Sequence, residues 1–217
     1  MTLIPYEHIE IRENNERLVA LSADEFFLEP RYFHAGYSRS DAVLARETIQ
    51  EKLRSVQHAL APYRLKVWDA WRPRSVQQNI YDAFWKEVIG KHADWDDDRV
   101  AHEVETFCTV ADDPKRVPPH ATGGTVDLTL CTASGDDVDM GTDFDHLGPE
   151  AASLYYEERK ENRDIRDHRR LLREAMVAEG FRKDDGEWWH YDYGNQLWAM
   201  SEKKPYAISG EANEELH

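Results

Sequence analysis

The segment that most constrains the fold is residues 120–131, HATGGTVDLTLC, where an acidic residue interrupts an apolar run. Alternating apolar and polar residues predict a β-strand over 125–131, with valine and leucines on one face. Asp127 falls on the opposite, polar face, and His120 precedes the strand in a glycine-containing loop. A carboxylate and an imidazole are both ligands of zinc in proteins. The segment therefore indicates part of a metal site, and the rest of the chain must supply the other ligands.

The length and charge of the chain restrict its class. A chain of 217 residues is most simply one domain, here 1–217, with a sizeable core. A net charge of −16 argues against nucleic acid and anionic membranes as partners. The first residues lack the features of a signal peptide, and no segment reaches membrane-spanning length. We therefore expect a soluble, cytoplasmic protein, in which Cys108 and Cys131 are buried thiols rather than a disulfide framework.

Apolar periodicity predicts most of the regular structure. Intervals of three and four between apolar residues predict three helices, over residues 40–63, 75–88 and about 161–179. Ser40 or Asp41 can cap the first of them. Residues 63–71 predict a strand that leads into a turn at Arg72 and Pro73. We expect one α+β domain, in which the polar motifs lie on strands and their loops.

Three further segments carry no apolar periodicity. Residues 92–100, HADWDDDRV, are interpreted as an acidic, solvated loop. Residues 111–120 are rich in proline and lead to the strand at 125. The tail, 201–217, is expected to be only partly ordered.

The other half of the candidate metal site lies in residues 186–194, GEWWHYDYG. His190 completes a set with His120 and Asp127, and a catalytic zinc site has three protein ligands and one open position. Glu187 is then free to act as the general base. Residues three apart face opposite ways in a regular strand, so Glu187 and His190 require a turn or bulge between them.

A third segment, WDAWRPRS at 68–75, carries a candidate for oxyanion stabilisation. Arg72 follows the predicted strand and is fixed by the next proline, and a guanidinium donates hydrogen bonds in a rigid fork. The alternative is an exposed arginine at a helix start that pairs with Asp69.

In this order the motifs resemble those of the VanX-type zinc D-alanyl-D-alanine dipeptidases. The resemblance rests on His-x-x-Gly-x-x-x-Asp at 120–127, the Arg-Pro pair, and Glu-Trp-Trp-His at 187–190. It also includes DMGTDFD at 139–145 and HRRLLREAMVAEGF at 168–181. It implies an α+β domain with a small antiparallel sheet flanked by helices and a zinc ion in a cleft beside the sheet. It also implies hydrolysis of D-Ala-D-Ala to free D-alanine with one zinc ion per chain.

The resemblance also implies a role for individual residues. In this family pattern the zinc ligands are His120, Asp127 and His190. Glu187 is the catalytic base, and Arg72 stabilises the transition state. Asp145 binds the free ammonium of the substrate, and Tyr32 is a second substrate-binding residue. The sequence departs from the family at Pro118 and Pro119, where polar residues are usual, which bears on substrate preference.

Two alternatives stay open at the level of sequence. A related D,D-carboxypeptidase or endopeptidase would act on longer cell-wall peptides with the same motifs. A non-catalytic, zinc-stabilised binding module is disfavoured, because structural zinc sites have four protein ligands.

Overall fold

The computed structural model describes residues 6–111 and 117–213. Its centre is a five-stranded sheet in the order β2-β4-β5-β7-β6. The strands are β2 (Phe27–Leu28), β4 (Arg64–Asp69), β5 (Thr125–Cys131), β6 (Arg182–Lys183) and β7 (His190–Asp192). Neighbouring strands are antiparallel, except that β2 is parallel to β4. The predicted α+β class is confirmed, and the sheet is antiparallel apart from this edge pair.

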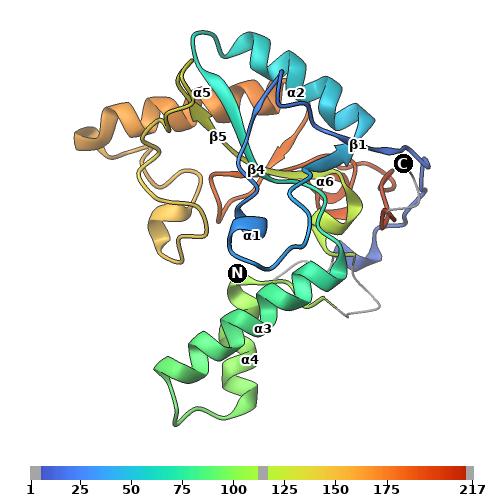
Figure 1. Cartoon of the computed structure of the whole chain (residues 1–217), viewed down its shortest axis with the longest axis vertical. Coiled ribbons are helices and arrows are strands. Elements are labelled where there is room, and N and C mark those ends of the chain that lie inside the picture. The colour runs from blue at the N-terminus through green and yellow to red at the C-terminus, as the bar shows by residue number, and fades with distance from the viewer. Residues whose placement is uncertain (1–5, 112–116, 214–217) are drawn as a thin grey trace.

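Two helices, α2 (Glu47–Ala59) and α5 (Arg163–Ala178), cover one face of the sheet (Figure 1). Their inward residues, such as Leu53 and Leu172, pack with Leu128 of β5 in the main core, and all three are fully buried. The strand predicted at 63–71 and the helix predicted at 161–179 correspond to β4 and α5. Burial of this apolar face fixes which way the other side chains of β5 point.

The first predicted helix begins later than expected. Residues 44–46 form β3 (Leu44–Arg46), which pairs with β1 (Leu18–Ala20), and α2 begins only at Glu47. The predicted caps at Ser40 and Asp41 are therefore wrong. The physical reason is tertiary, because the buried Arg46 guanidinium bonds to distant groups that hold this segment extended.

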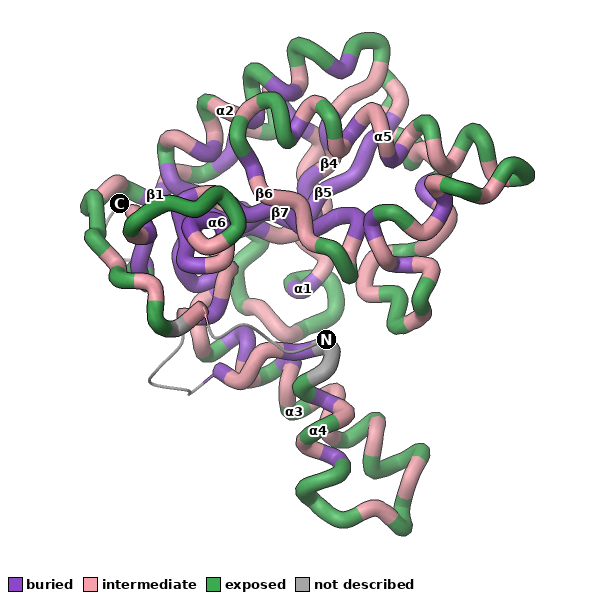
Figure 2. Tube along the Cα trace, turned by 180° about the vertical axis from the view of Figure 1, so that it is seen from behind, coloured by how far each residue is buried: buried purple, intermediate pink, exposed green. Residues whose placement is uncertain are grey.

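Helices α3 (Arg74–Lys91) and α4 (Asp97–Phe107) form a hairpin that projects from the sheet, with its far end largely exposed (Figures 1 and 2). Helix α3 matches the helix predicted at 75–88. The interpretation of 92–100 as a loop was wrong for its last four residues, which begin α4. Asp96 caps this helix by accepting from the Arg99 amide, and acidic residues in a first turn complement the helix dipole.

The remaining short elements are η1 (Tyr6–His8), α1 (Arg31–His34), η2 (Pro119–Thr122), η3 (Pro149–Ala151), η4 (Lys160–Asn162) and α6 (Gln196–Ser201). After α6 the chain packs back onto the body, where Ala207 and Ala212 are buried and the Trp71 indole donates to the Ala212 carbonyl. The tail thus has a defined path as far as 213, and residues 112–116 and 214–217 lie outside the described residues. Among the helices that the structure describes, none is long and apolar enough to cross a membrane.

Candidate active site

Three neighbouring strands place polar side chains in one row across the sheet. Asp127 of β5 pairs with His190 of β7 on one side and with Asp69 of β4 on the other. A register shift in β4 between Val67 and Asp69 makes this pairing possible. Residues that face each other in adjacent strands point to the same side. The three side chains therefore gather on the sheet face opposite the core.

A short helical turn, η2, brings His120 to this row. Gly123 ends the turn with φ 69°, a left-handed conformation that favours glycine, and a Cβ there would lie 2.5 Å from a Leu18 methyl group. His120 Nδ1 donates to the Ala70 carbonyl at 2.7 Å. Its Nε2 is thereby directed toward Asp127, whose Oδ2 lies 3.2 Å away.

The predicted ligands His120, Asp127 and His190 meet in space and fit a zinc ion. One ligand atom from each lies within 4.8 Å of the other two, and all three residues are buried. Asp127 Oδ1 is buried without a hydrogen-bond partner, although His190 Nδ1 is 3.1 Å from it. A buried carboxylate oxygen left unpaired beside two imidazole nitrogens is the donor set of an open zinc site.

Behind His190, Asp192 holds the imidazole from its far side. His190 Nε2 lies 3.3 Å from Asp192 Oδ1, which leaves Nδ1 to face the metal position. Thr125 and Asn195 donate to the same oxygen, and Arg182 binds the other. A carboxylate behind a metal-binding histidine fixes its tautomer and raises its basicity.

Glu187 lies beside the metal position without belonging to the row. A turn closed by the His190 amide and the Glu187 carbonyl, 3.4 Å apart, separates the two residues, as their spacing requires. Glu187 Oε2 is 3.7 Å from His190 Nδ1. Burial raises the pKa of Glu187 and His190 opposes this, while 39% of the side-chain surface remains accessible. A carboxylate with a raised pKa is suited to exchange protons near neutral pH.

Arg72 enters the site from the start of α3, where Pro73 is the N-cap. Its Nε donates to Asp69 at 2.9 Å, and its Nη2 lies 3.7 Å from Asp127. The side chain is only 8% exposed, so the alternative of a surface arginine is wrong. Burial alone would lower the pKa of Arg72, but surrounding acidic groups raise it, and the guanidinium stays charged.

Asp145 and Tyr32 meet beside Arg72. The Tyr32 hydroxyl donates to the Asp145 carboxylate at 3.1 and 3.2 Å, and the Arg72 guanidinium lies 4.5 Å from the Tyr32 ring centroid. Asp145 has φ 58°, a left-handed conformation that aspartate adopts at some cost. Burial raises the pKa of Asp145 to about 6, and Asp127 contributes to this rise. The carboxylate has no cation bonded to it among the described contacts, which suits it to bind one.

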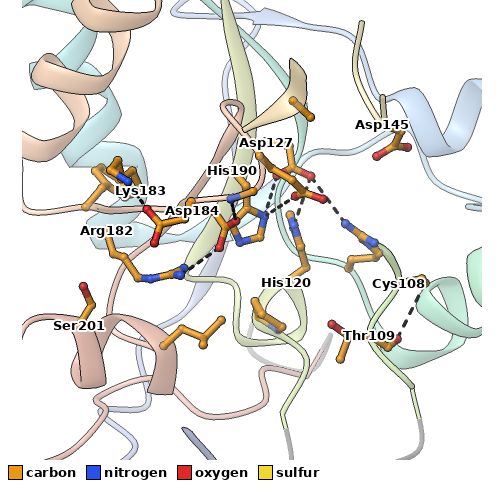
Figure 3. A pocket seen from close by; sticks show the side chains of 18 of the residues that line it. Cys108, Thr109, His120, Asp127, Asp145, Arg182, Lys183, Asp184, His190 and Ser201 are labelled. Atoms are coloured by element: carbon orange, nitrogen blue, oxygen red, sulfur yellow. Dashed lines mark hydrogen bonds and ion pairs between the residues drawn. The ribbon is translucent and has the colours of Figure 1, made fainter. Parts of the chain in front are cut away.

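One cavity of about 1300 Å³ connects the candidate metal ligands with Glu187, Arg72 and Asp145. Figure 3 shows the metal ligands in its middle, with Asp145 on one side and Arg182 and Ser201 on the other. All seven residues proposed from the sequence line it: Tyr32, Arg72, His120, Asp127, Asp145, Glu187 and His190. Pro119 also lines the cavity, next to His120.

Two residues of the site were missed from the sequence. Asp192 stands two positions after His190, and the period of two in a strand could have placed it on the same face. Gln77, on the first turns of α3, donates and accepts hydrogen bonds around Arg72. Its position carries no comparable signal, because it depends on how α3 packs against the end of α4.

The comparisons agree with this geometry. The D-ala-D-ala dipeptidase family (M15 peptidases) matches residues 34–207, about four fifths of the chain. A D-alanyl-D-alanine dipeptidase of Synechocystis is 29% identical, covering 91% of this chain and 90% of that protein. One of Enterococcus faecalis is also 29% identical, covering 69% and 72%. A solved structure of a mutant vancomycin-resistance D,D-pentapeptidase, VanY, with Zn(II) covers 77% of this chain and 85% of that one, at 18% identity and a TM-score of 0.48.

The family match begins at His34, the last residue of α1, and includes every site residue proposed from the sequence except Tyr32. M15 peptidases are zinc-dependent, and the buried His-Asp-His group suits that metal. The chain belongs to the D-ala-D-ala dipeptidase family of zinc metallopeptidases.

Proposed function

We propose that this protein is a cytoplasmic dipeptidase that hydrolyses D-alanyl-D-alanine to free D-alanine with one zinc ion per chain. The observation that carries the proposal is the convergence of three metal ligands with Glu187, which lies 3.7 Å from His190, and Arg72, which lies 3.7 Å from Asp127. A structural zinc site would have a fourth protein ligand, and no further His, Cys, Asp or Glu of the described residues joins this group.

The residues divide the reaction between them. Zinc, when bound, supplies Lewis-acid polarisation and lowers the pKa of water. Glu187 accepts the proton of the attacking water and returns it to the leaving amine. Arg72 Nη2, aimed at the metal position, donates to the oxyanion that develops on the scissile carbonyl; loss of one such donor costs on the order of 100- to 1,000-fold in rate.

Asp145 favours a dipeptide over a longer substrate. In a dipeptide the free ammonium lies one residue from the scissile bond, so an anion beside the metal position can bind it. An acylated substrate presents a neutral amide there and leaves the buried carboxylate without a cation, which is costly. The Tyr32 hydroxyl, which donates to Asp145, holds this anion in place.

The test compares free and N-blocked substrates. D-alanine release is measured from D-Ala-D-Ala and from N-acetyl-D-Ala-D-Ala, with wild-type protein and Asp145→Asn. We expect hydrolysis of the free dipeptide, little of the acetylated one, and a higher KM for the free dipeptide in the variant. Equal hydrolysis of both substrates by the wild-type protein would contradict the dipeptidase assignment.

The size of the cavity favours a second candidate, a D,D-carboxypeptidase or endopeptidase acting on longer cell-wall peptides. Pockets of roughly 300–1,000 Å³ hold drug-sized ligands, and this cavity exceeds that range. A pentapeptide that ends in D-Ala-D-Ala distinguishes the candidates, because a carboxypeptidase releases its terminal D-alanine, an endopeptidase cuts it at an internal bond, and a dipeptidase leaves it intact.

A further inference from the structure

Arg72 has a neutral partner that the reaction as proposed does not use. Gln77, one turn into α3, is 4% exposed and lines the same cavity. Its Oε1 accepts from Arg72 Nη1 at 2.9 Å. Asp69 already holds Nε, so the guanidinium is held at two of its three nitrogens. The third, Nη2, is the one that lies nearest the metal ligands, 3.7 Å from Asp127.

The neighbours of Gln77 determine which way its amide points. Nε2 donates to the Thr109 carbonyl at 2.8 Å and lies 3.1 Å from the Cys108 sulfur. If the amide were turned over, a donor would face the Arg72 guanidinium and an acceptor would face the Thr109 carbonyl. Both pairs would then be repulsive, so only the observed orientation satisfies the buried groups. The end of α4 thus fixes Gln77, and Gln77 in turn fixes the plane of the Arg72 guanidinium.

We propose that Gln77 is a positioning residue, which holds the Arg72 guanidinium in the plane that directs Nη2 to the developing oxyanion. This inference rests on the role assigned to Arg72 in the proposed function. The described hydrogen bonds of the Gln77 side chain go to Arg72, Cys108 and Thr109, so it acts through Arg72. The placement of the α3–α4 hairpin therefore affects the active site. Gln77 lies on α3, and Thr109, whose carbonyl accepts from Gln77, follows α4.

The kinetic test uses Gln77→Leu, which keeps the side-chain size and removes the hydrogen bonds to Arg72, Cys108 and Thr109. A misplacement of about 1 Å can cost on the order of 100-fold in rate, so we expect kcat to fall by about 10- to 100-fold. KM for D-Ala-D-Ala and zinc content should change little. Gln78→Leu is the matched control, because Gln78 is the next residue of α3 and, among the residues that the structure describes, its side chain bonds only to Asp82 at the surface.

A double-mutant cycle separates positioning from a purely structural role. If Gln77 acts through Arg72, then Gln77→Leu should cause no further loss of kcat when introduced into Arg72→Ala. A structural role predicts that the two losses multiply. Independent losses, or a Gln77→Leu enzyme with the wild-type kcat, would overturn the inference.

A spectroscopic readout tests the same inference without relying on turnover. In the wild-type protein the Nε–H of Arg72 is held by Asp69, and its NMR resonance should exchange slowly with water. Gln77→Leu should increase this exchange and the motion of the guanidinium, whereas Gln78→Leu should not. Failure of the wild-type protein to cleave D-Ala-D-Ala would refute the proposed function. An unchanged Arg72 resonance in Gln77→Leu would refute the positioning role, whatever the substrate is.

Discussion

Replacing Asp192 should weaken zinc binding although this residue is not itself a ligand. Three donors converge on Asp192 Oδ1: Thr125 Oγ1 at 2.8 Å, Asn195 Nδ2 at 2.6 Å and His190 Nε2 at 3.3 Å. The other oxygen accepts only from Arg182, at 2.5 Å. In Asp192→Asn the amide oxygen should therefore keep the three-donor position, and the amide nitrogen should face Arg182.

The expected magnitudes follow from what each variant removes. Loss of such a supporting carboxylate typically costs about 10- to 100-fold in metal affinity. Asp192→Asn keeps an acceptor for His190 but loses its charge, so we expect a loss near 10-fold, or about 1.4 kcal/mol. Asp192→Ala also frees the imidazole to turn, so we expect a loss near 100-fold, or about 2.8 kcal/mol.

The assay is competition for zinc between the protein and a chromogenic chelator at neutral pH. Asp184→Asn is the matched control, because Asp184 also pairs with Arg182, at 3.0 Å, but has no side-chain contact with His190. The control should bind zinc as the wild-type protein does. Wild-type zinc affinity in Asp192→Ala, or an equal loss in Asp184→Asn, would refute the assigned role of Asp192.

Three further changes test other parts of the site and fold. Glu187→Gln should retain zinc by elemental analysis but lose about 100- to 10,000-fold in kcat as expected for a general base, and near-full turnover would exclude that role. Burial raises the folded-state pKa of Asp145 to about 6, so ionisation of this carboxyl destabilises the zinc-free protein as the pH rises through that value. Asp145→Asn should therefore raise the Tm of the zinc-free protein at about pH 8 but not at about pH 4, and equal shifts of Tm at both pH values would contradict this. Arg46→Met should cost about 3–5 kcal/mol in denaturant unfolding because it leaves the Glu13 carboxylate without its buried cation, and a loss below about 1 kcal/mol would show that Arg46 does not hold this segment.

The parts of the site that were predictable are those fixed by local chain geometry. The period of two in β5 separates Asp127 from its apolar neighbours, and this depends on strand geometry alone. The turn between Glu187 and His190 was also required by their spacing. Grouping these residues with His120 depended on the order of the family motifs, because no local sequence pattern predicts that β5 and β7 are neighbouring strands.

The secondary-structure predictions were wrong where pairing with a distant strand or capping of a helix determined the local structure. Residues 44–46 continue the helical pattern of α2, but pairing with β1 holds them extended. The acidic run around Asp96 has the polarity of a loop, yet its carboxylates cap and begin α4, whose Val100 and Val104 are fully buried. In both places the sequence is compatible with two local structures, and tertiary packing selects one.

The metal site takes its geometry from the hydrophobic core on the other side of the sheet. Val126 and Leu128 are fully buried against that core and flank Asp127. A slip of one residue in the pairing of β5 would turn these apolar side chains toward the cavity and bury the carboxylate among the helices. The cost of that exchange excludes the slipped register, so His190 and Asp69 always face Asp127 across the sheet. Packing that has no contact with substrate therefore determines which side chains can meet a metal ion.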